Sequence, residues 1–302
     1  MTEEDIMKAA IYHRYGSSEV LQYEDVERPK PGPGQVLLQV AGTSFNPVDA
    51  GIRGGYLSEV FAISFPHVPG IDVAGTIAEL GDGADTWHVG VCAGSGGGTG
   101  SRTADGGTPD SAALPTVGLT AWQALFEIAD LLAGQTILIN GAGGAVGGYA
   151  VQLAKQAGAV VTATTKPASA ERLRRYGADR LIDYIDYDAA PVTLDGQPFD
   201  VVLNLISTSP EQTATLANVV ADGGFLVGTM TSGPEDPQRG LRTQRIFVRS
   251  DAAQLADLVA RVDAGQLQID VAERRPLSDI AAVHDAADAG RLPGKTILTP
   301  TD

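Results

Sequence analysis

The sequence is poor in cysteine, in basic residues and in long hydrophobic runs. A single cysteine, Cys92, among 302 residues excludes an internal disulfide and a zinc site built from several thiolates. Only 21 Lys and Arg accompany 37 Asp and Glu, giving a net charge of −16. This balance argues against a nucleic-acid partner, because phosphate binding depends on basic side chains. No apolar run approaches the ~20 residues that cross a bilayer, so no membrane segment is predicted.

The N-terminus also lacks the features of a secretory signal. Its first residues, MTEEDIMKAAIY, are acidic, with no basic region and no long apolar stretch, so we expect a cytoplasmic protein. Apolar residues make up 43% of the chain and charged residues 19%, which is typical of a globular protein. A length of 302 residues favours two domains.

The N-terminal part indicates short strands separated by turns. Residues 36–40 are β-like and follow the turn cluster Pro31–Gly34. Residues 73–80 form a second such run, which Gly81, Asp82 and Gly83 end. Short strands with frequent glycine and proline predict a small barrel or sandwich.

After Pro115 the pattern changes to strands that alternate with helices. Helices are predicted over 121–128, 145–157, 168–176 and 210–220, and strands over 136–140, 160–164, 180–183, 200–205 and 224–228. This alternation indicates βαβ units and a doubly wound parallel sheet, hence an α/β fold. In the tail, Leu255, Leu258, Val259 and Val262 predict an amphipathic helix, residues 277–284 a second helix, and residues 294–298 a last strand.

A glycine-rich turn lies between the first predicted strand of this region and its helix. Residues 140–147 read NGAGGAVG. Small residues at this place let the backbone approach a pyrophosphate, whose charge is met by free amides and by the positive helix end. The expected contacts come from Gly141, Gly143, Gly144, Ala145 and Val146. The alternative is a glycine turn that serves only tight packing between strand and helix.

The end of the next strand indicates which nicotinamide cofactor is used. An NAD site requires Asp or Glu there, to bond the ribose 2′-hydroxyl. This chain instead has Thr164, Thr165, Lys166 and Pro167, with Arg172 close in sequence. A cation and hydroxyls suit a 2′-phosphate, so Thr165, Lys166 and Arg172 predict NADPH. The alternative for Lys166 is an ordinary solvated loop lysine.

Four stretches of the chain resemble one known family. They are residues 42–56 (GTSFNPVDAGIRGGY), 66–75 (PHVPGIDVAG), 114–125 (LPTVGLTAWQAL) and 140–158. They are similar to the zinc-free quinone oxidoreductases of the medium-chain dehydrogenase/reductase superfamily, the zeta-crystallin-like group. The resemblance implies a GroES-like β-rich catalytic domain, built from residues 1–113 and 249–302. It also implies a Rossmann nucleotide-binding domain, residues 114–248, inserted between these segments.

The resemblance also implies roles for further residues. Asn46 would reach the nicotinamide ribose, and Asp49, Arg53 and Tyr56 would line the cleft, with Tyr56 and Arg53 as candidates to stabilise a developing oxyanion. The remaining implied cofactor contacts are Thr120 near the nicotinamide, Tyr184 against the adenosine, Ile206 and Thr229 after two strands, Phe247 and Val248 at the carboxamide, and Lys295 near the cleft. Alternatives are a helix cap for Asp49, a packed surface aromatic for Tyr56 and a core residue for Phe247.

The reaction that the resemblance implies is direct hydride transfer from NADPH to a quinone. Reduction of α,β-unsaturated carbonyls and cofactor binding without turnover are the alternatives. No metal is expected, because zinc relatives carry Gly-His-Glu where this chain has Gly70, Ile71 and Asp72, and its four histidines are scattered. The resemblance further implies a homodimer through the nucleotide domains.

One segment departs from the family pattern. Residues 90–113 lack about twenty expected residues, including strands, and residues 94–101 have the composition of a flexible linker. The segment is a natural deletion, an altered loop, or a stretch where the sequence is not the native one. Loss of the strands should open the cleft or expose an edge strand.

Overall fold

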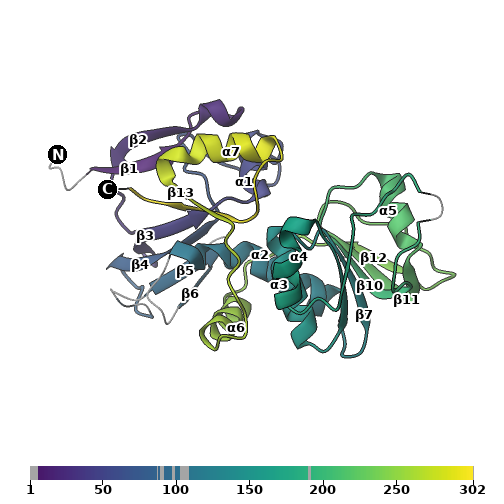
Figure 1. Ribbon diagram of the computed structural model, residues 1–302. Helices are drawn as coiled ribbons and strands as arrows, with labels where there is room; N and C mark the ends of the chain where they lie inside the picture. The colour runs from purple at the N-terminus through teal and green to yellow at the C-terminus, as the bar shows by residue number, and fades with distance from the viewer. Residues whose placement is uncertain are drawn as a thin grey trace. The chain divides into compact units, whose positions relative to one another are not determined.

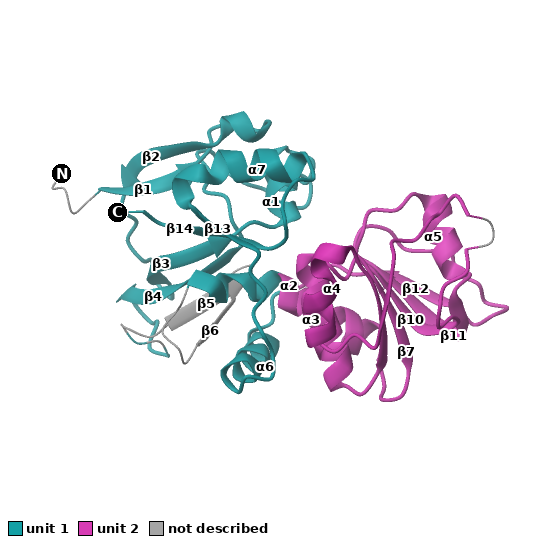
Figure 2. Cartoon of the chain, viewed as in Figure 1, with its two compact units in different colours: residues 1–116, 250–302 teal, residues 117–249 magenta. Residues whose placement is uncertain are grey.

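The computed structural model describes residues 6–86, 88, 92–96, 99–102, 109–189 and 192–301 (Figure 1). The chain forms two compact units, residues 1–116 with 250–302 (unit 1) and residues 117–249 (unit 2), coloured separately in Figure 2. The domain limits expected from the sequence, at 113/114 and 248/249, stay a prediction. Across the described ranges, no helix is both long enough and apolar enough to cross a membrane.

Unit 1 is rich in β-structure, as predicted. A two-stranded antiparallel sheet pairs β1 (Ile6–Ile11) with β2 (Gln22–Glu27). A six-stranded sheet has the order β13-β14-β3-β4-β5-β6, and all its pairs are antiparallel except β13 with β14. Its strands are β3 (Val36–Ser44), β4 (Asp72–Leu80), β5 (Cys92–Gly96), β6 (Thr99–Arg102), β13 (Glu273–Pro276) and β14 (Thr296–Thr299).

The expectation of a flexible linker over residues 94–101 is wrong for the part that the structure describes. The backbone of β5 pairs with β4, from Asp72 opposite Gly96 to Thr76 opposite Cys92, and β6 pairs with β5. Glycine and serine have low strand propensity, so the sequence gives no strand signal here, and tertiary pairing with β4 decides the conformation. Residues 103–108, between β6 and the 3-10 turn Pro109–Ala113, lie outside the described residues.

Three helices belong to unit 1, in the part of the chain that is described. They are α1 (Pro47–Arg53), α6 (Ala252–Asp263) and α7 (Ile280–Asp288), the last preceded by the 3-10 turn Leu277–Asp279. Leu255, Leu258 and Val259 are the buried residues of α6, which confirms the predicted apolar face. Ile280 and Val283 of α7 pack in a core with residues of the strands and of the β1–β2 connection, namely Ala10, Tyr12, Val20, Leu21, Phe45 and Leu298.

Unit 2 contains the predicted doubly wound sheet. Its six strands have the order β12-β11-β10-β7-β8-β9, and every neighbouring pair is parallel. The strands are β7 (Thr136–Asn140), β8 (Val160–Thr164), β9 (Arg180–Ile182), β10 (Phe199–Asn204), β11 (Val220–Gly228) and β12 (Arg242–Arg245). Continuous apolar runs such as Ile137–Ile139 form the central strands, because both faces of a parallel sheet are covered.

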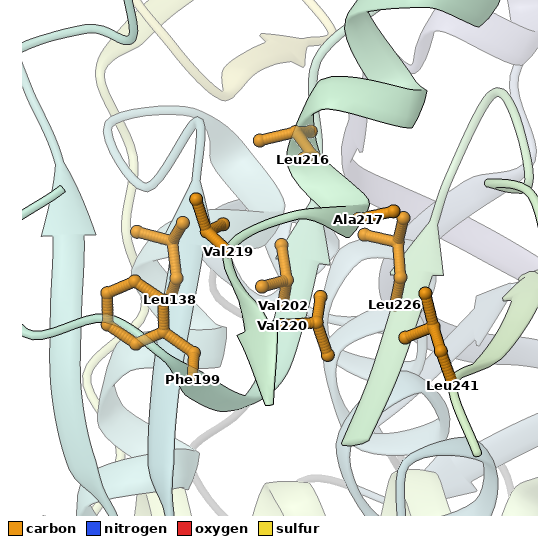
Figure 3. Packing of buried hydrophobic residues seen from close by; sticks show 9 residues of the cluster. All are labelled: Leu138, Phe199, Val202, Leu216, Ala217, Val219, Val220, Leu226 and Leu241. Atoms are coloured by element: carbon orange, nitrogen blue, oxygen red, sulfur yellow. The ribbon is translucent and has the colours of Figure 1, made fainter. Parts of the chain in front are cut away.

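The helices of this region follow the predicted alternation. They are α2 (Pro115–Trp122), α3 (Ala145–Gln156), α4 (Pro167–Arg175) and α5 (Pro210–Ala217). The helix expected over 121–128 begins earlier, at Pro115, and continues as a π-helical turn over Gln123–Ile128. One core cluster joins side chains from β7, β10, β11 and α5 and is shown in Figure 3: Leu138, Phe199, Val202, Leu216, Ala217, Val219, Val220, Leu226 and Leu241.

The strand order creates a switch point between β7 and β10. From β7 the chain proceeds outward through β8 to β9, and it then returns to place β10 on the other side of β7. The connections after β7 and β10 therefore diverge. At such a point, doubly wound sheets bind ligands in a crevice at the carboxyl ends of the strands. The glycine turn follows β7, and Ile206 follows β10.

Candidate functional site

The glycine turn after β7 combines tight packing with an open segment. Gly141 has φ +90°, and a Cβ there would lie 2.7 Å from Cγ2 of Ile206. A Cβ on Gly147 would lie 2.4 Å from the carbonyl oxygen of Ala142. At Gly144, in contrast, the nearest atom would be 3.4 Å away. A Cβ on Gly143 would lie 2.8 Å from Oγ of Ser169. Packing therefore accounts for Gly141 and Gly147 and also restricts Gly143, whereas Gly144 leaves room beside the backbone.

The turn leads into a helix whose first amides lack helical acceptors. Gly144 is the N-cap of α3 and has no side chain to cap it. The N–H groups of Ala145 and Val146 are among the first four of the helix, which cannot bond within it. Because the helix dipole adds positive potential at this end, the turn fits a pyrophosphate.

Buried polar side chains form a hydrogen-bond network at the start of the turn. The hydroxyl of Thr164, the last residue of β8, accepts the N–H of Gly141 at 2.8 Å and donates to Oδ1 of Asn140 at 3.2 Å. Nδ2 of Asn140 in turn donates to Oδ1 of Asn204 at 2.8 Å and to the hydroxyl of Tyr187 at 3.0 Å. Sequence reasoning missed this network. Its signal was the polar residue that ends each of the apolar strands β7, β8 and β10.

The segment after β8 brings two predicted residues together. Nζ of Lys166 lies 5.2 Å from the centroid of the Tyr184 ring, and both side chains are exposed. Within the described residues, the Lys166 ammonium has no ion-pair partner. Thr165 is buried, and its hydroxyl lies 2.8 Å from that of Ser169. This end of the sheet thus offers a free cation next to an aromatic face.

Arg172 has a contact that the sequence did not predict. Its Nη2 donates to the carbonyl oxygen of Gly143 at 2.7 Å, so it ties α4 to the glycine turn. This contact makes Arg172 a positioning residue of the turn. A further role at the 2′-phosphate stays a prediction.

The other predicted residues of unit 2 differ in exposure. Thr120 is buried on α2, and the backbone N–H of Thr229 donates to the carbonyl oxygen of Asn204 at 3.1 Å. Ile206 is partly exposed, Val248 is half-buried, and the Phe247 side chain is 61% exposed. The alternative that Phe247 belongs to the core is therefore wrong.

Unit 1 contains a buried polar cluster around Asp72. Oδ2 of Asp72 accepts hydrogen bonds from Ser44 Oγ at 2.9 Å, Asn46 Nδ2 at 2.9 Å and Lys295 Nζ at 3.2 Å. Its Oδ1 accepts from the backbone N–H of Thr116 at 3.0 Å and from the Thr116 hydroxyl at 2.7 Å. The β3–β4 register places Ser44 opposite Asp72, which starts the cluster.

Lys295 is almost completely buried in this cluster. Besides Asp72, its ammonium donates to Oδ1 of Asn46 at 2.7 Å and to the carbonyl oxygen of Phe45 at 3.2 Å. Burial lowers the pKa of Lys295, although the nearby Asp72 carboxylate opposes the change. The ammonium thus already has three oxygen partners inside unit 1, and its expected contact with a cofactor is not supported.

Asn46 belongs to the same cluster, and its expected role at the cofactor stays a prediction. Asn46 is 2% exposed, its Oδ1 accepts from Lys295 and its Nδ2 donates to Asp72. Both ends of the amide are therefore engaged. Asn46 is therefore a member of the buried cluster, with both its oxygen and its nitrogen bonded inside unit 1.

Arg53 is also bonded to side chains and backbone of unit 1. Its guanidinium is buried, with Nη1 donating to Nδ1 of His284 at 2.8 Å, Nη2 paired with Asp288 at 2.6 Å and Nε donating to the carbonyl oxygen of Gly16 at 3.2 Å. These bonds join α1 to α7. Burial lowers the pKa of His284 to about 4, so this imidazole is neutral at pH 7 and accepts from Arg53. The role of Arg53 at a developing oxyanion stays a prediction.

Asp49 and Tyr56, the other two residues expected to line the cleft, differ from each other in burial. Oδ2 of Asp49 accepts the backbone N–H of Asn46 at 2.8 Å, so Asp49 caps the start of α1, which was the alternative to its role in the cleft. Burial raises the pKa of Asp49 to about 7, although the bond from Asn46 opposes the rise. Tyr56, in contrast, is 89% exposed and stays available for a ligand.

In the described part of the chain, no three His, Cys, Asp or Glu side chains lie close enough to hold a metal ion. The side chain of Cys92 lies outside the described residues. Zinc prefers three or four such ligands, so the described residues do not fit a zinc site. Zinc independence of the protein stays a prediction.

Comparisons with known proteins agree with both halves of the fold. Residues 32–125 match the alcohol dehydrogenase GroES-like domain, and residues 176–298 match a family described as zinc-binding dehydrogenase. The chain is 30% identical to a chloroplast envelope quinone oxidoreductase homolog of Arabidopsis thaliana, over 98% of this chain and 99% of that protein.

Two further relatives extend the comparison. The mitochondrial NAD(P)H oxidoreductase RTN4IP1 of Bos taurus is 27% identical, over 97% of this chain and 89% of that protein. A mycobacterial protein whose structure was solved in complex with NADPH has 23% identity, with a TM-score of 0.82 over 97% of this chain and all of that one. The last likeness shows the fold alone. With its GroES-like and dehydrogenase regions matched and a relative aligned over nearly its whole length, the chain belongs to the medium-chain dehydrogenase/reductase superfamily, in its quinone oxidoreductase-like group.

Proposed function

We propose that this chain is an NADPH-dependent oxidoreductase that transfers hydride directly to a small-molecule quinone. The observation that carries the proposal is the glycine turn, open at Gly144, before the uncapped N-terminus of α3, at the switch point of a parallel sheet. Membership of the quinone oxidoreductase-like group supports the substrate class. Expected contacts of the turn with the pyrophosphate come from the backbone of Gly141, Gly143, Gly144, Ala145 and Val146.

The residues after β8 support NADPH over NADH. No carboxylate follows Thr164, where a ribose 2′-hydroxyl would be bonded, and the Lys166 ammonium is exposed and unpaired in the described residues. Thr165 and Lys166 would bind the 2′-phosphate, and the exposed Tyr184 ring would pack against the adenosine. Thr120, Ile206, Thr229, Phe247 and Val248 remain the expected neighbours of the nicotinamide half.

When bound, the reduced nicotinamide supplies the hydride. The protein contributes by orienting the two reactants and by keeping water away from them. Tyr56 carries an exposed hydroxyl that could donate to the oxygen on which negative charge develops. A proton from solvent completes the hydroquinone, so no protein acid is required.

The test of the function is NADPH oxidation in the presence of a simple quinone, run beside a titration of NADPH binding. We expect binding and turnover, with lower turnover of enones and enals. Binding without turnover on any acceptor would contradict the proposal and favour a sensor or structural role. Turnover of enones alone would assign the chain to reduction of α,β-unsaturated carbonyls.

The cofactor preference has its own test in Lys166→Glu. We expect the Kd for NADPH to rise roughly tenfold, because one charge-assisted contact is replaced by repulsion, and the Kd for NADH to stay unchanged. Lys30→Glu, which makes the same charge change at an exposed lysine of unit 1, is the control. An equal effect of Lys166→Glu on both cofactors would contradict the assignment of the 2′-phosphate site.

Two expectations rest on the resemblance alone. A homodimer through the nucleotide domains stays a prediction, which the mass in solution by light scattering would test. A cytoplasmic location also stays a prediction, since two of the relatives are named as chloroplast and mitochondrial proteins.

A further inference from the structure

The hydrogen-bond network at the glycine turn of unit 2 continues beyond β10. Nδ2 of Asn204, the last residue of β10, donates to the hydroxyl of Thr208 at 2.9 Å. The hydroxyls of Thr208 and Thr213 lie 2.8 Å apart, and Thr213 donates to the carbonyl oxygen of Ser209 at 2.8 Å. Ser209 is the N-cap of α5. A chain of side-chain hydrogen bonds therefore connects the glycine turn to the start of α5.

Backbone groups near both ends of this chain fix the direction of its bonds. The N–H of Gly141 can only donate, so the Thr164 hydroxyl accepts it and gives its own proton to Asn140. The carbonyl oxygen of Ile206 can only accept, and it lies 3.3 Å from Nδ2 of Asn204. The amide nitrogen of Asn204 therefore faces Ile206, and its Oδ1 faces the donor nitrogen of Asn140.

The threonine hydroxyls beyond β10 continue in the same direction. Because Thr213 gives its proton to Ser209, the bond between Thr208 and Thr213 is donated by Thr208. The hydroxyl of Thr231, which follows β11, lies 3.2 Å from that of Thr213 and adds a second donor there. Hydrogen bonds aligned in this way polarise and strengthen one another, so the loss of one weakens its neighbours.

We propose that Asn204 and Thr208 are positioning residues of the glycine turn, on which they act through this chain of bonds. Both side chains are buried, and the Thr208 hydroxyl already has partners on two sides. They hold the Gly141 amide on Thr164 of β8 and thereby fix the start of the turn that leads into α3. Their effect on pyrophosphate binding rests on the proposed function, whereas the positioning itself does not.

The first test uses the full chain without cofactor. In Thr208→Val, hydrogen exchange of the Gly141 amide, followed by NMR, should be about two- to tenfold faster than in the wild type, because one hydrogen bond of the chain is lost. The Thr136 amide bonds to Asp200 at 2.7 Å at the opposite end of β7 and should keep its rate. Equal acceleration at both amides would show a general loss of stability and overturn the proposal.

Matched variants separate the hydroxyl of Thr208 from its shape. Thr208→Ser keeps the hydroxyl and should restore the wild-type exchange rate at Gly141. Thr215→Val removes a hydroxyl of α5 that bonds to Glu211 outside the chain, and it should leave Gly141 unchanged. Thr213→Val interrupts the same chain one bond further on and replaces Thr208→Val if that variant does not fold. Unchanged exchange at Gly141 in these valine variants of the chain would overturn the proposal.

The second test measures binding of NADPH and of 2′-phospho-ADP-ribose, which has the pyrophosphate but no nicotinamide. Thr208→Val should raise both Kd values by about the same factor, two- to tenfold, because the two ligands share the glycine turn. A rise for NADPH alone would place the effect of Thr208 at the nicotinamide and overturn the proposal. If the wild type binds neither ligand, the proposed function fails, and the exchange rate of Gly141 still decides the positioning role.

Discussion

At the scale of the residue, the buried carboxylate of Asp72 is the most connected polar group described in unit 1. Its two oxygens accept five hydrogen bonds, one of them from the buried ammonium of Lys295. Asp72→Ala should lower the free energy of unfolding by about 3–5 kcal/mol, because it leaves a buried cation without its counter-charge. Urea unfolding followed by circular dichroism measures the loss.

The control for this variant is the exposed carboxylate of Asp25, which pairs with Lys8 at the surface. Asp25→Ala should change the free energy of unfolding by less than about 1 kcal/mol. Equal effects of the two variants would contradict the importance of burial. The double variant Asp72→Ala, Lys295→Met should recover part of the loss, because it also removes the unpaired charge.

His284 makes stability depend on pH. Its pKa is about 4 in the folded chain, below the ordinary value near 6.5, because burial and Arg53 both disfavour the proton. Between these values the unfolded state binds more protons, so stability falls as the pH decreases from 6.5 toward 4. The contribution of His284 to the free energy of unfolding should fall by about 2 kcal/mol at most from pH 7 to pH 5. Urea unfolding of wild type and His284→Gln at both pH values measures it.

On going from pH 7 to pH 5, the free energy of unfolding should change less favourably in the wild type than in the variant. An equal change in both would show that His284 does not contribute. Asp49 acts in the opposite direction, since its raised pKa of about 7 makes the folded state bind more protons between about 4 and 7. The difference between wild type and variant isolates His284 from this contribution.

Several site residues could not be assigned from the sequence, for a physical reason. Asn46, Asp72 and Lys295 are distant in the chain and meet only because β14 and β4 pair with opposite edges of β3. A short motif reports local geometry, such as the cap formed by Asp49, and gives no information on such pairing. Polar residues that were expected to face a cofactor are therefore buried in a structural cluster.

At the scale of the element, the βαβ region was predicted well and the β5–β6 hairpin was not. Strands β7 and β10 are continuous apolar runs, and such runs report burial on both faces directly. The residues of β5 and β6 are mainly small and polar. Their strand conformation depends on hydrogen bonds to β4, which composition does not reveal.

The glycine turn allows packing and ligand binding to be separated. Gly147→Ala places a methyl group against backbone atoms of Ala142, which cannot move away easily, so it should cost about 1–3 kcal/mol of stability. Gly144→Ala meets no close atom and should cost less than about 1 kcal/mol. It should nevertheless weaken NADPH binding, because the methyl group occupies space beside the proposed pyrophosphate site.

Thermal unfolding and an NADPH titration of both variants test this distinction. If Gly144→Ala left NADPH affinity unchanged, the pyrophosphate would not approach the middle of the turn. A large loss of stability in Gly144→Ala would instead show that packing governs the whole turn. The comparison needs no knowledge of the substrate.

At the scale of the whole molecule, the open question of chemistry is whether a metal takes part. One of the matched families is described as zinc-binding, yet the described residues offer no set of three ligands. The family resemblance implies that Ile71 and Asp72 stand where zinc relatives carry His and Glu. Buried carboxylates bind metals when they are free, but Asp72 already accepts five hydrogen bonds. The Lys295 ammonium supplies the positive charge beside it.

We therefore expect the protein to need no metal. Dialysis against EDTA should leave quinone reduction and the melting temperature unchanged, and elemental analysis should find far less than one zinc per chain. A loss of activity that added zinc restores would contradict this expectation. The side chain of Cys92 lies outside the described residues and is a metal ligand by chemistry, so Cys92→Ser is the informative variant. If Cys92→Ser retains activity, hydride transfer depends only on the cofactor and on the protein's own dipoles, and no Lewis acid is required.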